Sequence, residues 1–215
     1  MNLKKYKDWI TPAIMFLVSI VVFIVYINIK VFEIAILIQI ILSFMGTLVI
    51  PTFNLFSKKI KIPLFLNILI AINLILAMDL GSALRFYDLF LIWDKFCHMY
   101  FGFEVAIIFT YIAQLLKIDK INIVGYSVIM MTFVLGCAAV WEMGEFFMDS
   151  NFGDDFQNIV RSQELGRLPQ SDTIWDIIVA AIGDLIYLAI YLPECYLSDF
   201  KIHNALGFHL NQEQK

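Results

Sequence analysis

The chain has 215 residues, of which 61% are hydrophobic and only 16% charged, with a formal net charge of −4 at pH 7. Its mean hydropathy of +0.82 is higher than that of a soluble globular domain, so we expect lipid as its solvent. The sequence has no basic patch with interleaved aromatic residues, which argues against nucleic acid as a partner.

The first apolar run, Trp9–Asn28, follows Lys4, Lys5 and Lys7 and resembles the start of a signal peptide. It contains about 20 residues, which is long enough to cross the hydrocarbon core, and no small-residue cleavage site follows it. The sequence therefore predicts a retained first transmembrane helix.

Six apolar runs of this kind follow one another along the chain. They are continuously apolar rather than alternating, which indicates helices and not the strands of a barrel. We expect an all-α, polytopic transmembrane bundle, with residues 1–200 forming a single domain and residues 201–215 a short cytoplasmic tail. In that tail His203 and His209 are expected to lie in solvent. The predicted spans are Trp9–Ile29, Val31–Val49, Pro63–Phe86, Leu89–Leu116, Ile121–Met148 and Asp172–Leu192.

The lysines predict the orientation of this bundle. With six spans, the clusters before the first span, between spans two and three, between spans four and five, and after span six all fall on one side. Because cytoplasmic loops carry an excess of Lys and Arg, that side is predicted to be the cytoplasm, together with both termini. The clusters are Lys4, Lys5 and Lys7, then Lys58, Lys59 and Lys61, then Lys117 and Lys120, and finally Lys201.

The cysteines point to no redox or metal chemistry. Cys97, Cys137 and Cys195 lie in or beside apolar runs and form no C-x2-C pair. An odd number without a spacing pattern argues against a disulfide framework or a thiolate metal site, and we interpret them as small buried hydrophobic residues.

The acids are the most informative feature of the sequence. Three membrane-embedded stretches carry them in helical register, and the topology places all three stretches at the outer side. Ionisable groups at membrane depth are costly and normally mark a site, so we expect them to meet in the bundle. The stretches are Asp94-x3-His98, Glu142-x2-Glu145-x3-Asp149 and Asp172-x3-Asp176.

So many carboxylates cannot all be ionised at low dielectric without cations: either several hold protons, or a positive group lies among them. A divalent metal would resolve the excess, and oxygen ligands with one imidazole suit Mg2+, Mn2+, Fe2+ or Zn2+. We predict His98, Glu142, Glu145 and Asp176 as metal ligands. Asp94, His98 and Asp172 are predicted as catalytic residues, with Asp149, Asp184 and Arg85 in supporting or loop positions.

Structural explanations compete with the functional one for some of these residues. Asp172 after Ser171 suits the positive end of a helix dipole, and Asp94 lies beside Lys95, which can reach the interface. Gly183 lies on the Asp172 face of its helix and would let another helix approach closely. The long outer connection Ser150–Ser171 is typical of a lid, a binding segment or a disordered loop.

The combined motif resembles the YjdF-type family of bacterial inner-membrane proteins, and its Asp-x3-His element is similar, more weakly, to VanZ-like membrane proteins. The residues that carry the resemblance are Trp93-Asp94-Lys95-Phe96-x-His98-x3-Gly102-Phe103, Glu142-x2-Glu145, and Asp172-Thr173-x-Trp175-Asp176 ending in Gly183. The resemblance implies a multi-pass protein of the bacterial cytoplasmic membrane and marks these residues, without naming a reaction. Members often have a further acid shortly before the Asp-Thr-x-Trp-Asp run, where this chain has Pro169.

Three functions remain open from the sequence, and whether the protein is an enzyme is one of the open points. The first is a metal-dependent membrane enzyme acting on lipid or lipid-linked substrates at the headgroup level. The second is a cation or proton transporter or channel that uses the acids as an outer binding station. The third is a non-catalytic membrane partner or sensor, in which the acids set helix packing. The lipid bilayer is the expected partner in each case, and no protein partner is indicated.

Overall fold

The computed structural model describes residues 3–29, 33–118, 121–152 and 155–208, and these residues form helices and connections with no strand among them. Contacts divide the chain after Cys97, inside helix α6 (Trp93–Leu116), into two units, Met1–Cys97 and His98–Lys215. Each unit is described by itself. Lys120 and His209, which are part of the sequence predictions, lie outside the described residues.

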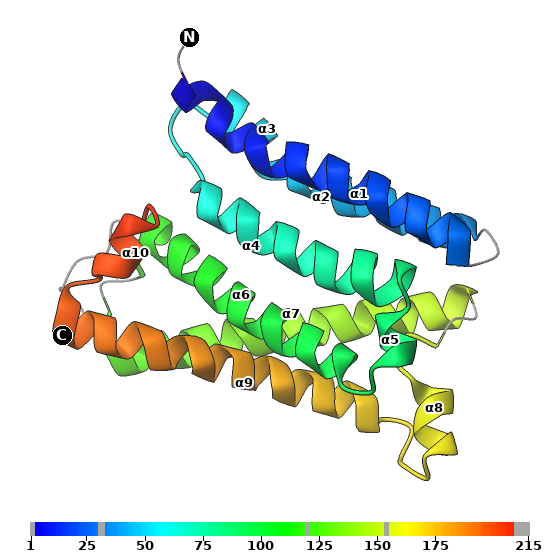
Figure 1. Cartoon of the computed structure of the whole chain (residues 1–215). Coiled ribbons are helices and arrows are strands. Elements are labelled where there is room, and N and C mark those ends of the chain that lie inside the picture. Colours follow the sequence, from blue (N-terminus) through cyan, green and yellow to red (C-terminus); the bar gives the residue numbers. More distant parts are fainter. Residues whose placement is uncertain (1–2, 30–32, 119–120, 153–154, 209–215) are drawn as a thin grey trace. The chain divides into compact units, whose positions relative to one another are not determined.

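The first unit is built from three membrane-length helical segments (Figure 1). Its interior includes Val22, Tyr26, Ile36 and Ile40, and the Tyr26 hydroxyl accepts the backbone N–H of Glu33 at 2.6 Å. In chain order the elements are η1 (Leu3–Trp9), α1 (Ile10–Ile29), α2 (Ile34–Thr47), α3 (Val49–Phe56), α4 (Leu64–Leu74), the π-helical η2 (Ile75–Ala83) and α5 (Phe86–Leu89).

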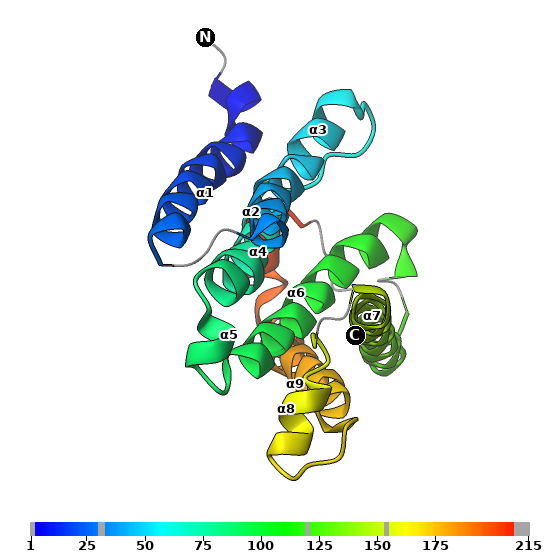
Figure 2. The same ribbon diagram turned by 90° about the vertical axis from the view of Figure 1, so that its right-hand side faces the viewer.

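The second unit contains the part of α6 from His98 onward and two further long helices, α7 (Ile123–Phe152) and α9 (Ser171–Pro193). Helix α8 (Ile159–Glu164) lies in the connection between α7 and α9. The π-helical η4 (Glu194–Ser198) and α10 (Lys201–Ala205) follow α9. In Figure 1, α8 and α10 lie at opposite ends of α9, and Figure 2 shows the three long helices from another side.

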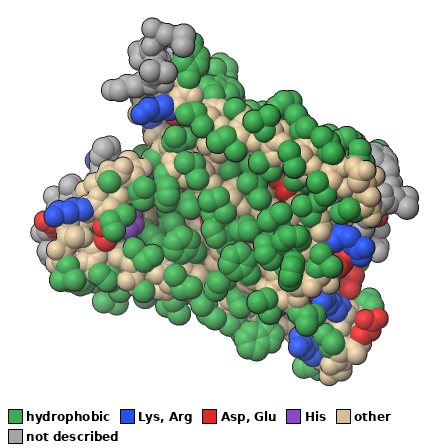
Figure 3. Space-filling model, viewed as in Figure 1, with side chains coloured by type: hydrophobic (Ala, Val, Ile, Leu, Met, Phe, Trp, Pro, Cys, Tyr) green, Lys and Arg blue, Asp and Glu red, His purple; other side chains and the backbone are tan. Residues whose placement is uncertain are grey.

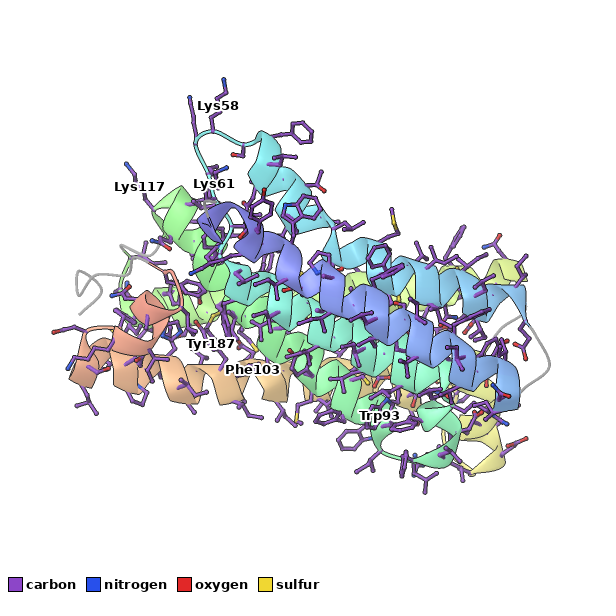
Figure 4. The ribbon with its side chains drawn as sticks, turned by 45° about the horizontal axis from the view of Figure 1, so that its top comes forward. Lys58, Lys61, Trp93, Phe103, Lys117 and Tyr187 are labelled. Carbon is purple, nitrogen blue, oxygen red and sulfur yellow. The ribbon has the colours of Figure 1, made fainter. Side chains whose placement is uncertain are left out.

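Two glycines set the crossing of α6 and α9. A Cβ atom on Gly102 of α6 would collide with the backbone of Ala180, and one on Gly183 of α9 would collide with the backbone of Met99 and Phe103. The close approach predicted for Gly183 is therefore confirmed, and it is reciprocal. One turn further along α9, the rings of Tyr187 and Phe103 meet edge to face at 6.0 Å (Figure 4).

Among the described residues, six helical segments are long and apolar enough to cross a membrane, which confirms the predicted number of spans. Hydrophobic side chains cover most of the face seen in Figure 3, as expected for contact with lipid. Lys58 and Lys61 lie in the connection between α3 and α4, and Lys117 directly follows α6 (Figure 4). The orientation of the termini and the single-domain organisation stay predictions. The segments are Tyr6–Ile29, Ile34–Phe56, Leu64–Ala83, Trp93–Leu116, Ile123–Asn151 and Ser171–Ser198.

The prediction that His203 lies in solvent is wrong: its side chain is buried, with 4% exposure. Asp199 and Phe200 both adopt positive φ (52° and 55°), which turns α10 back onto the end of α9. Glu194 then accepts the backbone N–H groups of Ile202 and His203 and also contacts the His203 imidazole. The polar segment after the last span is therefore folded as far as Phe208, the last described residue.

Candidate functional site

His98 is the centre of the candidate site. It lies in α6 with only 6% of its surface exposed, and each of its ring nitrogens faces a buried carboxylate. Nδ1 lies 3.8 Å from Glu142 Oε1 of α7, and Nε2 lies 3.7 Å from Asp176 Oδ1 of α9. One imidazole thus joins the three long helices of the second unit.

Glu145 extends the group along α7. It is half-buried, and its Oε1 accepts a hydrogen bond of 2.8 Å from Trp141 Nε1. The spacing of three residues brings Glu142 and Glu145 to one face of the helix. One ligand atom each from His98, Glu142 and Glu145 lie within 4.8 Å of one another.

The distances from His98 to Glu142 and to Asp176 are each compatible with an ion bound between one ring nitrogen and the carboxylate that faces it. Two donor atoms bound to one ion at about 2.0–2.2 Å lie about 3–4.5 Å apart, whereas a direct hydrogen bond needs about 3 Å. Whichever nitrogen of His98 binds an ion, the other faces a carboxylate that can accept its proton, as is usual for metal-binding histidines.

Asp149 and Asp172 fix the connection between α7 and α9. The Asp149 carboxylate, at the end of α7, accepts the backbone N–H groups of Phe156 at 2.7 Å and Gln157 at 3.0 Å. The Asp172 carboxylate, in the first turn of α9, accepts a hydrogen bond of 2.7 Å from Asn158 Nδ2. The sequence left open whether Ser150–Ser171 is a lid, a binding segment or a disordered loop. The described part of this connection is held by these hydrogen bonds and contains the short helix α8.

Asp94 and Arg85 belong to the first unit. Asp94 lies in the first turn of α6, one helical turn before His98, and its Oδ2 pairs with Lys95 Nζ at 2.8 Å. Arg85 is half-exposed and pairs through Nε with Asp88 Oδ2 at 2.6 Å. The structure therefore gives Asp94 and Arg85 close charged partners on neighbouring residues of the chain, and their assignment to the site remains a prediction.

Asp184 lies in α9 eight residues beyond Asp176, or about 12 Å along the helix. It is completely buried, and neither carboxylate oxygen has a hydrogen-bond partner among the described residues. It therefore lies apart from the group around His98, and its predicted supporting position at the site stays a prediction. A buried acid inside a membrane span is costly and normally has a function.

The sequence did not predict two further polar features of the second unit. Glu104 of α6 is buried, with 3% exposure, and its position inside a span was the available signal. The second feature is a hydrogen-bonded chain at the far end of α9: Tyr126 donates to Thr110 at 2.9 Å, Thr110 bonds to Tyr187 at 2.8 Å, and Tyr187 bonds to His203 at 2.8 Å.

The comparison with family models gives one match, to a family described as "Predicted membrane protein (DUF2238)", over residues 11–193. No curated protein and no solved structure matches the chain. The match covers all three motif stretches around His98, Glu142 and Asp176, and the YjdF-type proteins that these motifs resemble form this family. The chain therefore belongs to the DUF2238 family of predicted membrane proteins.

Proposed function

We propose that this protein is a membrane enzyme that holds a divalent metal ion at His98, Glu142, Glu145 and Asp176 and acts on a lipid or lipid-linked substrate. The observation that carries the proposal is the group formed by His98, Glu142 and Glu145, of which one ligand atom each lie within 4.8 Å of one another. Asp176 faces the other nitrogen of His98 at 3.7 Å. An oxygen-rich set with one imidazole suits Mg2+, Mn2+, Fe2+ or Zn2+.

The reaction class follows from the chemistry of such an ion and from the predicted depth of the site. A metal in this position would polarise a phosphoryl or ester group or activate a water molecule. Predicted to lie near the outer end of the spans, the site would be at the level of lipid headgroups. The two nitrogens of His98 face Glu142 and Asp176, so either nitrogen could bind the ion while a carboxylate orients the other.

Metal content tests the proposal. We expect near-stoichiometric metal, by elemental mass spectrometry, in the detergent-purified protein after loading with Mg2+, Mn2+, Fe2+ or Zn2+. Glu142→Gln/Glu145→Gln should lose it while its thermal unfolding in detergent shows that it is folded. Glu164→Gln, in exposed α8, is the matched control and should retain the metal. Absence of metal from the loaded wild-type protein would rule out a catalytic metal.

Proton or cation transport is the second candidate, and Asp184 is the observation that favours it. Its buried carboxylate lies one helical turn before Tyr187 on α9, and Tyr187 leads to His203 at the end of the last span. In proteoliposomes this function predicts a flux of protons or divalent cations that Asp184→Asn abolishes. Without flux in the wild-type protein, transport is excluded.

A further inference from the structure

A groove on the surface of α7 adjoins the candidate metal site. It has a volume of about 650 Å3 and is lined almost entirely by apolar atoms. Phe101 of α6 forms one wall, and the other lining residues belong to one stripe of α7 that includes Phe133, Gly136, Val140, Trp141 and Gly144. From Thr132 to Gly144 the stripe covers about 18 Å of helix, which is more than half the thickness of the hydrocarbon core.

The two glycines make the groove open. A Cβ atom added at Gly136 or at Gly144 would meet nothing within 4 Å, in contrast to Gly102 and Gly183 at the helix crossing. The walls are accessible as well, since Val140 is 67% and Trp141 46% exposed. Because these side chains are missing, the groove continues along the helix between aromatic rings.

Trp141 connects this groove to the acids. Its ring stacks at a tilt against Phe101, with the centroids 5.9 Å apart, while its Nε1–H donates to Glu145 Oε1. The same indole is thus the apolar wall of the groove and a hydrogen-bond partner of a predicted metal ligand. One end of the groove lies at the carboxylates, and the rest runs along the apolar part of the span.

We propose that this groove binds one hydrocarbon chain of the substrate lipid, with its phosphate-bearing headgroup at the metal site. The inference rests on the proposed function, because the metal ion would supply the positive charge that an anionic headgroup requires. Because one end of the groove lies beside Glu145, an apolar chain attached to a headgroup at the metal site can continue directly along it, whereas a second helix would have no such relation to the acids. A second copy of the protein is the occupant that the test must exclude.

The experiment uses the full chain in vesicles of phosphatidylethanolamine and phosphatidylglycerol. A trace of phosphatidylglycerol with a photoactivatable diazirine on one acyl chain serves as the probe, and diacylglycerol with the same chain serves as the headgroup-free comparison. After illumination, the labelled peptides are identified by mass spectrometry. We expect label concentrated on Phe101 and on residues 132–144, beyond that on the lipid-exposed Ile182 and Ile186 of α9.

Filling the groove should remove this label. Gly136→Leu and Gly144→Leu are expected to lower it about tenfold, because the chain loses the burial of several methylene groups. Gly125→Leu adds the same bulk to α7 outside the groove, where a Cβ makes only ordinary contacts, and should leave the label unchanged. Glu142→Gln/Glu145→Gln should remove the preference for phosphatidylglycerol over diacylglycerol.

Three results would overturn the inference: label on the groove no higher than on α9, equal loss in Gly125→Leu and Gly136→Leu, or a disulfide between two copies through Gly136→Cys in the same vesicles. Metal content, measured on each variant, separates this inference from the proposed function. A protein that binds metal but shows no groove label would refute the groove alone. A labelled groove in a protein without metal would refute the metal site and with it the assignment of the headgroup.

Discussion

At the scale of single residues, glycine has two opposite uses in the second unit. Gly102 and Gly183 allow two backbones to touch, whereas Gly136 and Gly144 leave a surface open. The sequence predicted the close approach at Gly183 from its position on the Asp172 face, but it gave no such indication for the other three glycines, which also lie inside apolar spans. The difference is in what a Cβ atom would meet, and it gives a direct test by substitution.

Replacing Gly183 with alanine should destabilise the protein by about 1–3 kcal/mol, because the added methyl group would force the backbones of α6 and α9 apart. Gly144→Ala makes the same chemical change in open space and should be neutral or stabilise by about 0.5–1 kcal/mol through helix propensity. Thermal unfolding of both variants in one detergent measures the difference. Equal midpoints would show that the close crossing is absent.

The residue scale also shows what the sequence could predict of the candidate site. His98, Glu142 and Asp176 were expected to meet because they share one depth and helical register, and the structure places them together. The burial of His203 was not predictable in this way. It depends on positive φ at Asp199 and Phe200. Non-glycine residues seldom adopt this conformation, and no local sequence pattern predicts it here.

At the scale of elements, the apolar runs fixed the number of spans, since each needs about 20 residues to cross the bilayer. Their ends were less predictable. The second span was expected to end at Val49, close to Pro51, but α3 continues the helical segment to Phe56. A proline in the first turn of a helix interrupts no hydrogen bond, so Pro51 is compatible with this continuation.

The connection between α7 and α9 illustrates a second limit of sequence reasoning. Its length suggested a lid or a disordered loop, but the side chains that tie it are Asp149 and Asp172, which were predicted for the site. A carboxylate at a helix end can bind a ligand or accept hydrogen bonds from neighbouring backbone N–H groups equally well. Only the path of the intervening chain decides between them.

Removing these ties should expose the connection to protease. In Asp149→Ala the amides of Phe156 and Gln157 lose a charged acceptor, each bond contributing about 1.5–3 kcal/mol. Even 1.4 kcal/mol of easier local opening means about tenfold faster trypsin cleavage at Arg161 or Arg167. Asp172→Ala should act in the same direction through Asn158.

Glu164→Ala is the control for this experiment, because Glu164 is exposed in the same connection and makes none of these bonds. Its cleavage rate should equal that of the wild type. If the Asp149→Ala rate also equals it, the connection is not held by the carboxylate.

At the scale of the whole molecule, the orientation in the membrane decides where the site operates. The lysine clusters predict that the connection between α3 and α4 is cytoplasmic and that the connection containing α8 is external. A variant with Cys97, Cys137 and Cys195 replaced by alanine provides the background for single cysteines. In intact spheroplasts a membrane-impermeant maleimide should label Gln163→Cys, and it should label Lys59→Cys only after permeabilisation. The reverse pattern would place the acids at the cytoplasmic face.

The reciprocal contact of Gly102 and Gly183 has a consequence for the history of the family. Each glycine faces the backbone of the opposite helix, so a larger residue at either position requires a greater distance between α6 and α9. At that distance the other position no longer has to be glycine. The two positions are therefore expected to covary among DUF2238 proteins, both glycine in some lineages and both replaced in others. Lineages that replaced both would carry His98 and Asp176 on helices set further apart, and they should have diverged in the residues around His98 as well.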